Sequence, residues 1–189
     1  MKKENFEIIV FGRGGQGAKT CAQIIAESAM LSGNEIQGFP EYGPERRGAP
    51  VRAFVRISNK KIRIHEPVTN PDIVLVIDYK LFETMPELKN YNCPIIINTH
   101  KEKSYFKNLK SKELYTIDGS AIALEEIKID NPNIVLIGSL LKYLKNNNLE
   151  KLVGYQDVKK SIEIQFEKKG KRQIIEPNLN CLKKGFEKI

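Results

Sequence analysis

The segment FGRGGQG near the start of the chain has the residue types and spacing to hold an anion. Gly12, Gly14 and Gly17 fit the pattern G-x-G-x-x-G, between an apolar run and an alanine-rich run. Glycines allow a tight turn and a close backbone approach to a ligand, and a following helix offers unpaired N–H groups and a positive dipole end. The alternative is a glycine turn that only lets the helix pack tightly on a sheet, and the spacing leaves both open.

Two common nucleotide motifs are incomplete in this loop. A dinucleotide site also needs an acidic residue about 20 residues further on, at the end of the second strand, where Gln37 or Gly38 stands here. A triphosphate-binding loop ends in Gly-Lys-Ser/Thr, whereas Gly17 is followed by Ala18-Lys19-Thr20. A free-standing dinucleotide-binding oxidoreductase therefore remains an alternative that the missing acid weakens.

A second segment, GFPEYGPERRGAP at residues 38–50, can bring positive charge to the same place. Its glycines and prolines shape the backbone in advance. Arg46 and Arg47 project from it, with Arg52 and Arg56 on the strand that follows, and guanidinium groups bind phosphates and carboxylates through paired hydrogen bonds. We expect a basic cleft if this segment folds over the glycine loop, or a salt-bridged turn if it does not.

The net charge of +8 is concentrated in two parts of the chain. Residues 45–66 and 151–189 each have a net charge of +5, from seven bases against two acids and from ten against five. Such patches attract phosphates, nucleic acid or an acidic protein face. The second alternates lysines with acids, which is typical of a solvated helical surface. A nucleic-acid-binding module that uses the first patch is disfavoured, because its arginines lack an array of stacking aromatic residues.

Strands alternate with helices along the chain, which predicts an α/β fold. We expect one domain over residues 1–189, with a mixed, mostly parallel sheet flanked by helices and an inserted antiparallel hairpin made by residues 51–57 and 62–65. The other expected strands are 6–11, 35–39, 73–78, 94–98 and 115–118. The expected helices are 18–32 before Gly33, 80–89, 120–127, 134–145, 158–168 and 178–188.

Composition excludes several classes of protein. The longest uninterrupted apolar run, residues 73–77, is far shorter than the roughly 20 residues that span a membrane, and the N-terminus does not resemble a secretory signal, so we expect a cytoplasmic protein with no membrane partner. Cys21, Cys93 and Cys181 cannot ligate a four-thiolate cluster and lack zinc-site spacing, so we expect no metal and buried filler thiols.

His65 and His100 have no nucleophile beside them, so we expect no catalytic residue in this chain. Asp78 and Asp118 end predicted strands and are expected to cap the helices that follow.

Three motifs together resemble the gamma subunit of the 2-oxoacid:ferredoxin oxidoreductases, especially the pyruvate and 2-oxoisovalerate members. They are GRGGQGA after the first strand, FPEYGPERRGAPVRAFVRIS, and PDIVLVID, and the similarity extends to the tail KKGKRQIIEPNLNCLKKGFE. One departure is the segment NIVLIG at residues 133–138, where many relatives have a turn of smaller residues.

The resemblance implies a complex with alpha, beta and delta subunits that uses thiamine diphosphate and [4Fe-4S] clusters. That complex decarboxylates a 2-oxoacid, passes electrons to ferredoxin and transfers the acyl group to coenzyme A. The resemblance assigns thiamine diphosphate and the [4Fe-4S] clusters to partner subunits. The gamma chain is then structural and shares the coenzyme A site. The implied ligand-binding residues are Gly12, Arg13, Gly14, Gly15, Gln16, Gly17, Arg46 and Arg47, with Glu45 and Gly48 completing the second motif.

Overall fold

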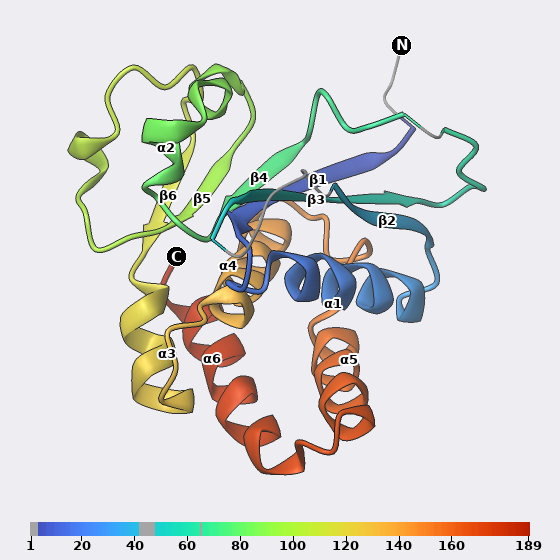
Figure 1. Cartoon of the computed structure of the whole chain (residues 1–189). Coiled ribbons are helices and arrows are strands. Elements are labelled where there is room, and N and C mark those ends of the chain that lie inside the picture. Colours follow the sequence, from blue (N-terminus) through green and yellow to red (C-terminus); the bar gives the residue numbers. More distant parts are fainter. Residues whose placement is uncertain (1–3, 42–47, 65) are drawn as a thin grey trace.

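A six-stranded mixed sheet forms the centre of the molecule, in the order β2-β3-β1-β4-β5-β6. The computed structural model describes residues 4–41, 48–64 and 66–189, without the side chains of residues 39–41. The α/β architecture predicted from the sequence is confirmed. Helices cover one face of the sheet along its whole width, and short helical turns cover part of the other (Figure 1).

The four strands on one side of the sheet run parallel. They are β1 (Phe6–Arg13), β4 (Ile73–Val76), β5 (Ile95–Asn98) and β6 (Leu114–Ile117). Three of them, β1, β4 and β5, are buried almost without interruption because both faces of the sheet are covered there. Their carboxyl ends therefore lie along the same edge of the sheet.

An antiparallel hairpin is present, but it is formed by β2 and β3, so the predicted pairing of residues 51–57 with residues 62–65 is wrong. Strand β3 (Pro50–Ser58) pairs antiparallel with β1 on one edge and with β2 (Glu35–Glu41) on the other. A strand has only two edges for backbone hydrogen bonds, so β3 cannot also pair with residues 62–65. Residues 61–64 instead follow an irregular path, held by a hydrogen bond from Gln37 Nε2 to the Ile64 carbonyl oxygen, and His65 is outside the described residues.

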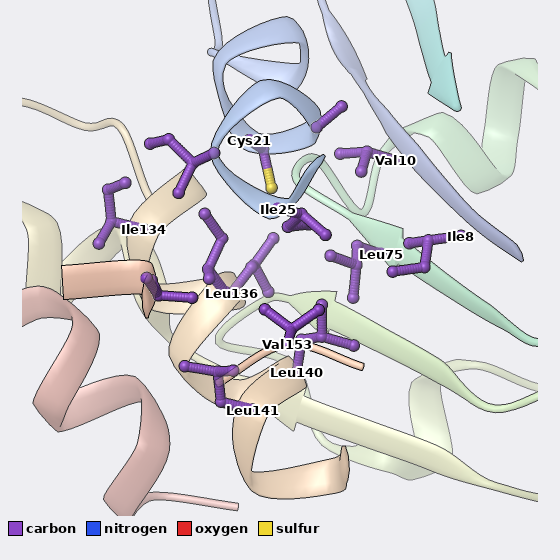
Figure 2. Close-up of a cluster of buried hydrophobic side chains, with 14 of the residues drawn as sticks. Ile8, Val10, Cys21, Ile25, Leu75, Ile134, Leu136, Leu140, Leu141 and Val153 are labelled. Carbon is purple, nitrogen blue, oxygen red and sulfur yellow. The ribbon is translucent and has the colours of Figure 1, made fainter. Parts of the chain in front are cut away.

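Successive residues of β1 point to opposite faces and so enter two separate cores. Ile8 and Val10 pack under α1 (Ala18–Leu31) and α4 (Asn133–Asn146), in the cluster that Figure 2 shows. Ile9 and Phe11 enter the smaller core beneath α2 (Leu81–Thr84) and the loops on that side. The helices α3 (Gly119–Ile127), α5 (Tyr155–Lys168) and α6 (Ile175–Glu187) complete the layer on the α1 side.

The helix predicted over residues 80–89 is divided in two. Helix α2 ends at Thr84 and a 3₁₀ turn, η1, covers Pro86–Asn90. Proline disfavours the helical conformation of the residue before it, and Met85 has φ −129° and ψ 80°. Two further 3₁₀ turns are η2 (Lys103–Tyr105) and η3 (Arg172–Ile174). The predicted end of α1 is confirmed, since Gly33 has φ +84° and its N–H reaches the Met30 carbonyl oxygen.

Helices α4 and α6 cross closely because each contributes a glycine to the contact. A Cβ on Gly138 would come within 2.2 Å of the Leu182 carbonyl oxygen, and one on Gly185 within 2.1 Å of the Val135 carbonyl oxygen. Ser139 also donates a hydrogen bond to the Gly185 carbonyl oxygen at 3.1 Å. The segment NIVLIG is thus the start of a buried helix rather than a turn.

Within the described residues, no helix is both long and apolar enough to cross a membrane.

Gly185→Ala should destabilise the protein strongly, because its Cβ forces α4 and α6 apart. We expect a loss of about 3 kcal/mol in the free energy of unfolding, the upper end of the usual cost of overpacking. Gly33→Ala is the control: its Cβ meets open space, so only the left-handed backbone costs energy, about 1 kcal/mol. Urea unfolding measures both, and equal losses would contradict the close crossing.

Candidate anion-binding site

The glycine loop joins the carboxyl end of β1 to the start of α1, as the sequence predicts. Gly12 is the last but one residue of the strand, and a Cβ there would lie 3.1 Å from Ala18 Cβ and 3.4 Å from Ile77 Cδ1. Gly15 and Gly17 have φ +98° and +82°, which is backbone that other residues rarely adopt. Gly12 is therefore needed for contact between the helix and the sheet, whereas Gly15 and Gly17 are needed for the backbone conformation of the turn.

Gly17 is the N-cap of α1 and brings no side chain to satisfy the first N–H groups of the helix. A Cβ at Gly17 would lie 2.5 Å from Asn133 Nδ2 and 2.9 Å from Asn131 Oδ1. Asn133, the first residue of α4, is buried and directs its amide at the Gly17 carbonyl oxygen, 3.4 Å away. The helix N-terminus is therefore pre-shaped by neighbouring backbone and amides, and it is suited to a negatively charged group.

The loop lies where the chain switches from one face of the sheet to the other. After β1 the chain enters α1 on one face, and after β4 it enters α2 on the opposite face. Ligands of open α/β sheets bind at such a switch point, outside the carboxyl ends of the strands. A cavity of about 330 Å³ opens here, lined by Gln16, Ile77, Asp78, Tyr79, Lys80, Asn98, His100, Ser120, Asp130 and Pro132.

Arg13 turns its guanidinium toward Asp78, which follows β4. Its Nε donates to Asp78 Oδ2 at 2.8 Å, and the two side chains are 26% and 13% exposed. A second guanidinium nitrogen, Nη1, is 3.4 Å from the Gly48 carbonyl oxygen. The positive charge of Arg13 is therefore largely matched inside the protein, although part of the guanidinium stays accessible.

Gln16 and the end of the second motif complete the loop. Gln16 Oε1 accepts the Arg13 backbone N–H at 2.7 Å, and its Nε2 is 3.4 Å from Asp78 Oδ2. Gly14 makes two backbone hydrogen bonds with the other segment, donating to the Ala49 carbonyl oxygen and accepting from the Gly48 N–H. The structure thus joins the glycine loop to residues 48–49, while Glu45, Arg46 and Arg47 are outside the described residues.

The two arginines of β3 do not form the basic face that the sequence suggests. Arg56 is only 2% exposed and donates from Nε to Glu7 Oε1 at 2.5 Å and from Nη1 to Gln37 Oε1 at 2.9 Å. Arg52 is half-buried against Tyr91; burial raises the pKa of that phenol, and the charge of Arg52 opposes the rise. A nucleic-acid surface on this strand is therefore contradicted by the burial of Arg56.

Three other residues considered in the sequence have different positions: Asp118 has a structural role, and Asp78 and His100 line the cavity. Asp118 caps α3 by accepting the Ala121 N–H at 2.9 Å, as expected. The expected role of Asp78 as a helix cap is wrong, because the N-cap of α2 is Lys80 and no side chain caps this helix. Asp78 accepts the Lys80 N–H and lies at the switch point. His100 is exposed at the cavity rim, 5.7 Å from Tyr79 between ring centroids in an edge-on arrangement.

Asn98 and Ser120, which the sequence motifs did not single out, contribute polar groups to the cavity. Asn98 ends β5, donates to the Ile77 carbonyl oxygen at 2.8 Å and accepts the Ser120 N–H at 3.0 Å. The signal was available, because a polar residue directly after a continuous apolar strand lies at the ligand-binding edge of the sheet.

The cysteine side chains do not suit metal ligation. Burial raises the pKa of the Cys21 thiol far above its ordinary value and that of Cys181 to about 12. Both therefore remain protonated near neutral pH and pack in the larger core, as predicted. Cys93 is half-buried. Among the described residues, no three His, Cys, Asp or Glu side chains gather in a way that could hold a metal ion.

The sequence model of the protein family described as pyruvate ferredoxin/flavodoxin oxidoreductase matches residues 7–188 of this chain. The chain belongs to this family. It is 37% identical over 190 residues to pyruvate synthase subunit PorC of Thermotoga maritima, covering 99% of this chain and 96% of that relative. It is 38% identical over 188 residues to the pyruvate/ketoisovalerate oxidoreductases common subunit gamma of Pyrococcus abyssi, covering 96% of each. The resemblance stated from the sequence motifs is thereby confirmed.

Two solved structures have the same fold. The crystal structure of pyruvate oxidoreductase subunit PORC from Thermotoga maritima matches with a TM-score of 0.80 and 35% identity, covering 98% of this chain and 97% of that one. A 2-oxoglutarate:ferredoxin oxidoreductase from Magnetococcus marinus, with 2-oxoglutarate, coenzyme A and succinyl-CoA bound, matches with a TM-score of 0.76 at 20% identity. This match covers 97% of this chain but 31% of that one, so in that protein the family's fold is part of a longer polypeptide.

Gly17→Ala should disrupt the loop more than Gly48→Ala, although both residues have positive φ. The Cβ at Gly17 collides with Asn133, whereas the Cβ at Gly48 meets no atom of the described residues within 4 Å. We expect Gly17→Ala to cost about 2 kcal/mol more of the free energy of unfolding, since overpacking adds to backbone strain. Denaturant unfolding measures the difference, and an equal effect of the two variants would contradict the contact with α4.

Proposed function

We propose that this chain is the gamma subunit of a pyruvate-type 2-oxoacid:ferredoxin oxidoreductase, in which it is structural and helps to seat coenzyme A. The observation that carries the first part is similarity over nearly the whole length to subunits of such enzymes. Alpha, beta and delta partners supply thiamine diphosphate and the iron–sulfur clusters. The three cysteines of this chain support that division, because at least two of them are buried protonated thiols.

The glycine loop supports a share in coenzyme A binding. Coenzyme A has several phosphate groups, and the loop offers them an uncapped helix N-terminus at the switch point of the sheet. Arg46 and Arg47 are near in sequence to Gly48 and Ala49, which are hydrogen-bonded to Gly14. In this proposal the residues Gly12 to Gly17 shape the phosphate site, and the two arginines add charge-assisted hydrogen bonds.

The topology argues against the alternative of a free-standing dinucleotide-binding oxidoreductase. In that class the second strand lies beside the first, so its terminal acid reaches the ribose of the bound cofactor. Here β3 lies between β1 and β2, which moves the end of β2 about 10 Å from β1, the width of two strand spacings. An acid at the end of β2 is therefore out of place for this role.

Omission of this chain should abolish the activity of the assembled enzyme. The chain purified alone should not reduce ferredoxin with pyruvate, since it supplies no redox centre, and co-expression with the alpha, beta and delta subunits should give activity that depends on pyruvate and coenzyme A. The measurement is reduction of ferredoxin or of a viologen dye. The control is the same co-expression without this chain; full activity there, or activity of the chain alone, would overturn the proposal.

Replacement of Arg46 and Arg47 together by Ala should raise the coenzyme A KM of the assembled enzyme at least about tenfold, because each charged hydrogen bond contributes on the order of 1.5–3 kcal/mol. The rate of pyruvate decarboxylation should be unchanged. This rate is measured as the exchange of labelled carbon dioxide into pyruvate.

Lys60→Ala with Lys61→Ala is the matched control for this double variant. It removes the same charge beyond Ser58, at the opposite end of β3. An equal rise in coenzyme A KM in the control would indicate a general charge effect. Failure of the arginine variant to assemble would mark these residues as part of a subunit interface.

A further inference from the structure

Arg13 and Asp78 meet because the register of two parallel strands brings them side by side. Phe11 pairs with Val76 in the ladder between β1 and β4, and the Ile77 N–H continues it to the Phe11 carbonyl oxygen. Two residues beyond Phe11 and Val76, the chain reaches Arg13 and Asp78. The pair therefore stands at the switch point itself, at the base of the glycine loop.

Asp78 holds both ends of the loop with one carboxylate. Its Oδ2 accepts Arg13 Nε at 2.8 Å and lies 3.4 Å from Gln16 Nε2, while Oδ1 accepts the Lys80 N–H at 3.0 Å. Gln16 in turn accepts the Arg13 backbone N–H. These contacts form a hydrogen-bond network in which Arg13, Gln16 and Asp78 each contact the other two, around the turn that precedes α1.

Arg13 also connects this hydrogen-bond network to the second motif, GFPEYGPERRGAP. With Nε fixed on Asp78, Nη1 faces the Gly48 carbonyl oxygen, next to the two backbone hydrogen bonds between Gly14 and residues 48–49. Without the carboxylate, the guanidinium of Arg13, whose side chain is 26% exposed, would lose its charge partner and would turn toward solvent. The loop and the second motif would then be held together by fewer contacts.

We propose that Asp78 is a positioning residue for coenzyme A: acting through Arg13 and Gln16, it fixes the glycine loop in the conformation that accepts a phosphate group. This inference rests on the proposed role of the loop in seating coenzyme A. A loop already held in its bound conformation loses less entropy when the ligand binds, so Asp78 affects affinity without contacting the reacting atoms.

Asp78→Ala in the assembled enzyme tests the inference. We expect the coenzyme A KM to rise about tenfold through loss of preorganisation, with the pyruvate KM and kcat changed less than about twofold. Asp78→Asn keeps an acceptor oxygen for Arg13 without its charge, so it should give a smaller rise. A residue with only a structural role would lower kcat and raise both KM values together.

A double-mutant cycle with Arg13→Ala tests whether Asp78 acts through Arg13. If it does, the double variant should have a coenzyme A KM close to that of Arg13→Ala alone, since residues that act as a unit are not additive. Effects that multiply fully would overturn the inference, as would an unchanged coenzyme A KM in Asp78→Ala.

Asp157→Ala is the matched control variant. This carboxylate also joins distant segments, accepting a hydrogen bond from Ser32 Oγ at 2.6 Å, but it lines a depression together with residues 4–6, at the opposite edge of the sheet from the loop. It should lower stability and leave the coenzyme A KM unchanged.

The double variant of Arg46 and Arg47 distinguishes failure of the inference about Asp78 from failure of the proposed role of this chain in seating coenzyme A. If neither it nor Asp78→Ala changes the coenzyme A KM, the proposed role in seating coenzyme A fails. If only the arginine variant raises the KM, the inference about Asp78 fails alone. Failure of both Asp78→Ala and Asp78→Asn to assemble would make Asp78 an assembly residue and would also overturn the inference.

Discussion

Strand β1 has both of its edges occupied by strands that run in opposite directions, and the rest of the structure depends on this pairing. Antiparallel β3 lies on one edge and parallel β4 on the other, so the carboxyl ends of β1 and β4 lie side by side. The chain leaves β1 toward one face and β4 toward the other, so an opening forms between them. The glycine loop, the Arg13–Asp78 pair and the polar cavity all lie at that opening.

Among the described residues, backbone geometry rather than unpaired arginine charge supports the proposed phosphate site at this opening. Arg13 is matched by Asp78, and the buried Arg56 is matched by Glu7. These arginines therefore hold strands and loops together, because an unpaired guanidinium in such buried positions would be costly. The uncapped N-terminus of α1 and the turn at Gly15 and Gly17 remain as the features that suit a phosphate group.

The C-terminal helices connect the packing of the protein to the same loop. The close contact of Gly138 and Gly185 with the opposing helix backbones fixes α4 against α6. The first residue of α4, Asn133, then lies against Gly17 at the start of α1. Packing of α6 on α4 thus contributes to the surroundings of the glycine loop near the N-terminus.

The sequence by itself determined the alternation of strands and helices and the strand–glycine–helix unit, because apolar periodicity and glycine spacing are local properties. It indicated the family through the resemblance of its motifs to those of known members. It also indicated that Cys21 and Cys181 are core residues. Only the tertiary structure decided which strand pairs with β3, since residues 62–65 have a suitable alternating pattern but both edges of β3 are taken. Likewise, the partners of Arg13 and Arg56 are 65 and 49 residues away in sequence, and no local pattern specifies which charges the folded sheet brings together.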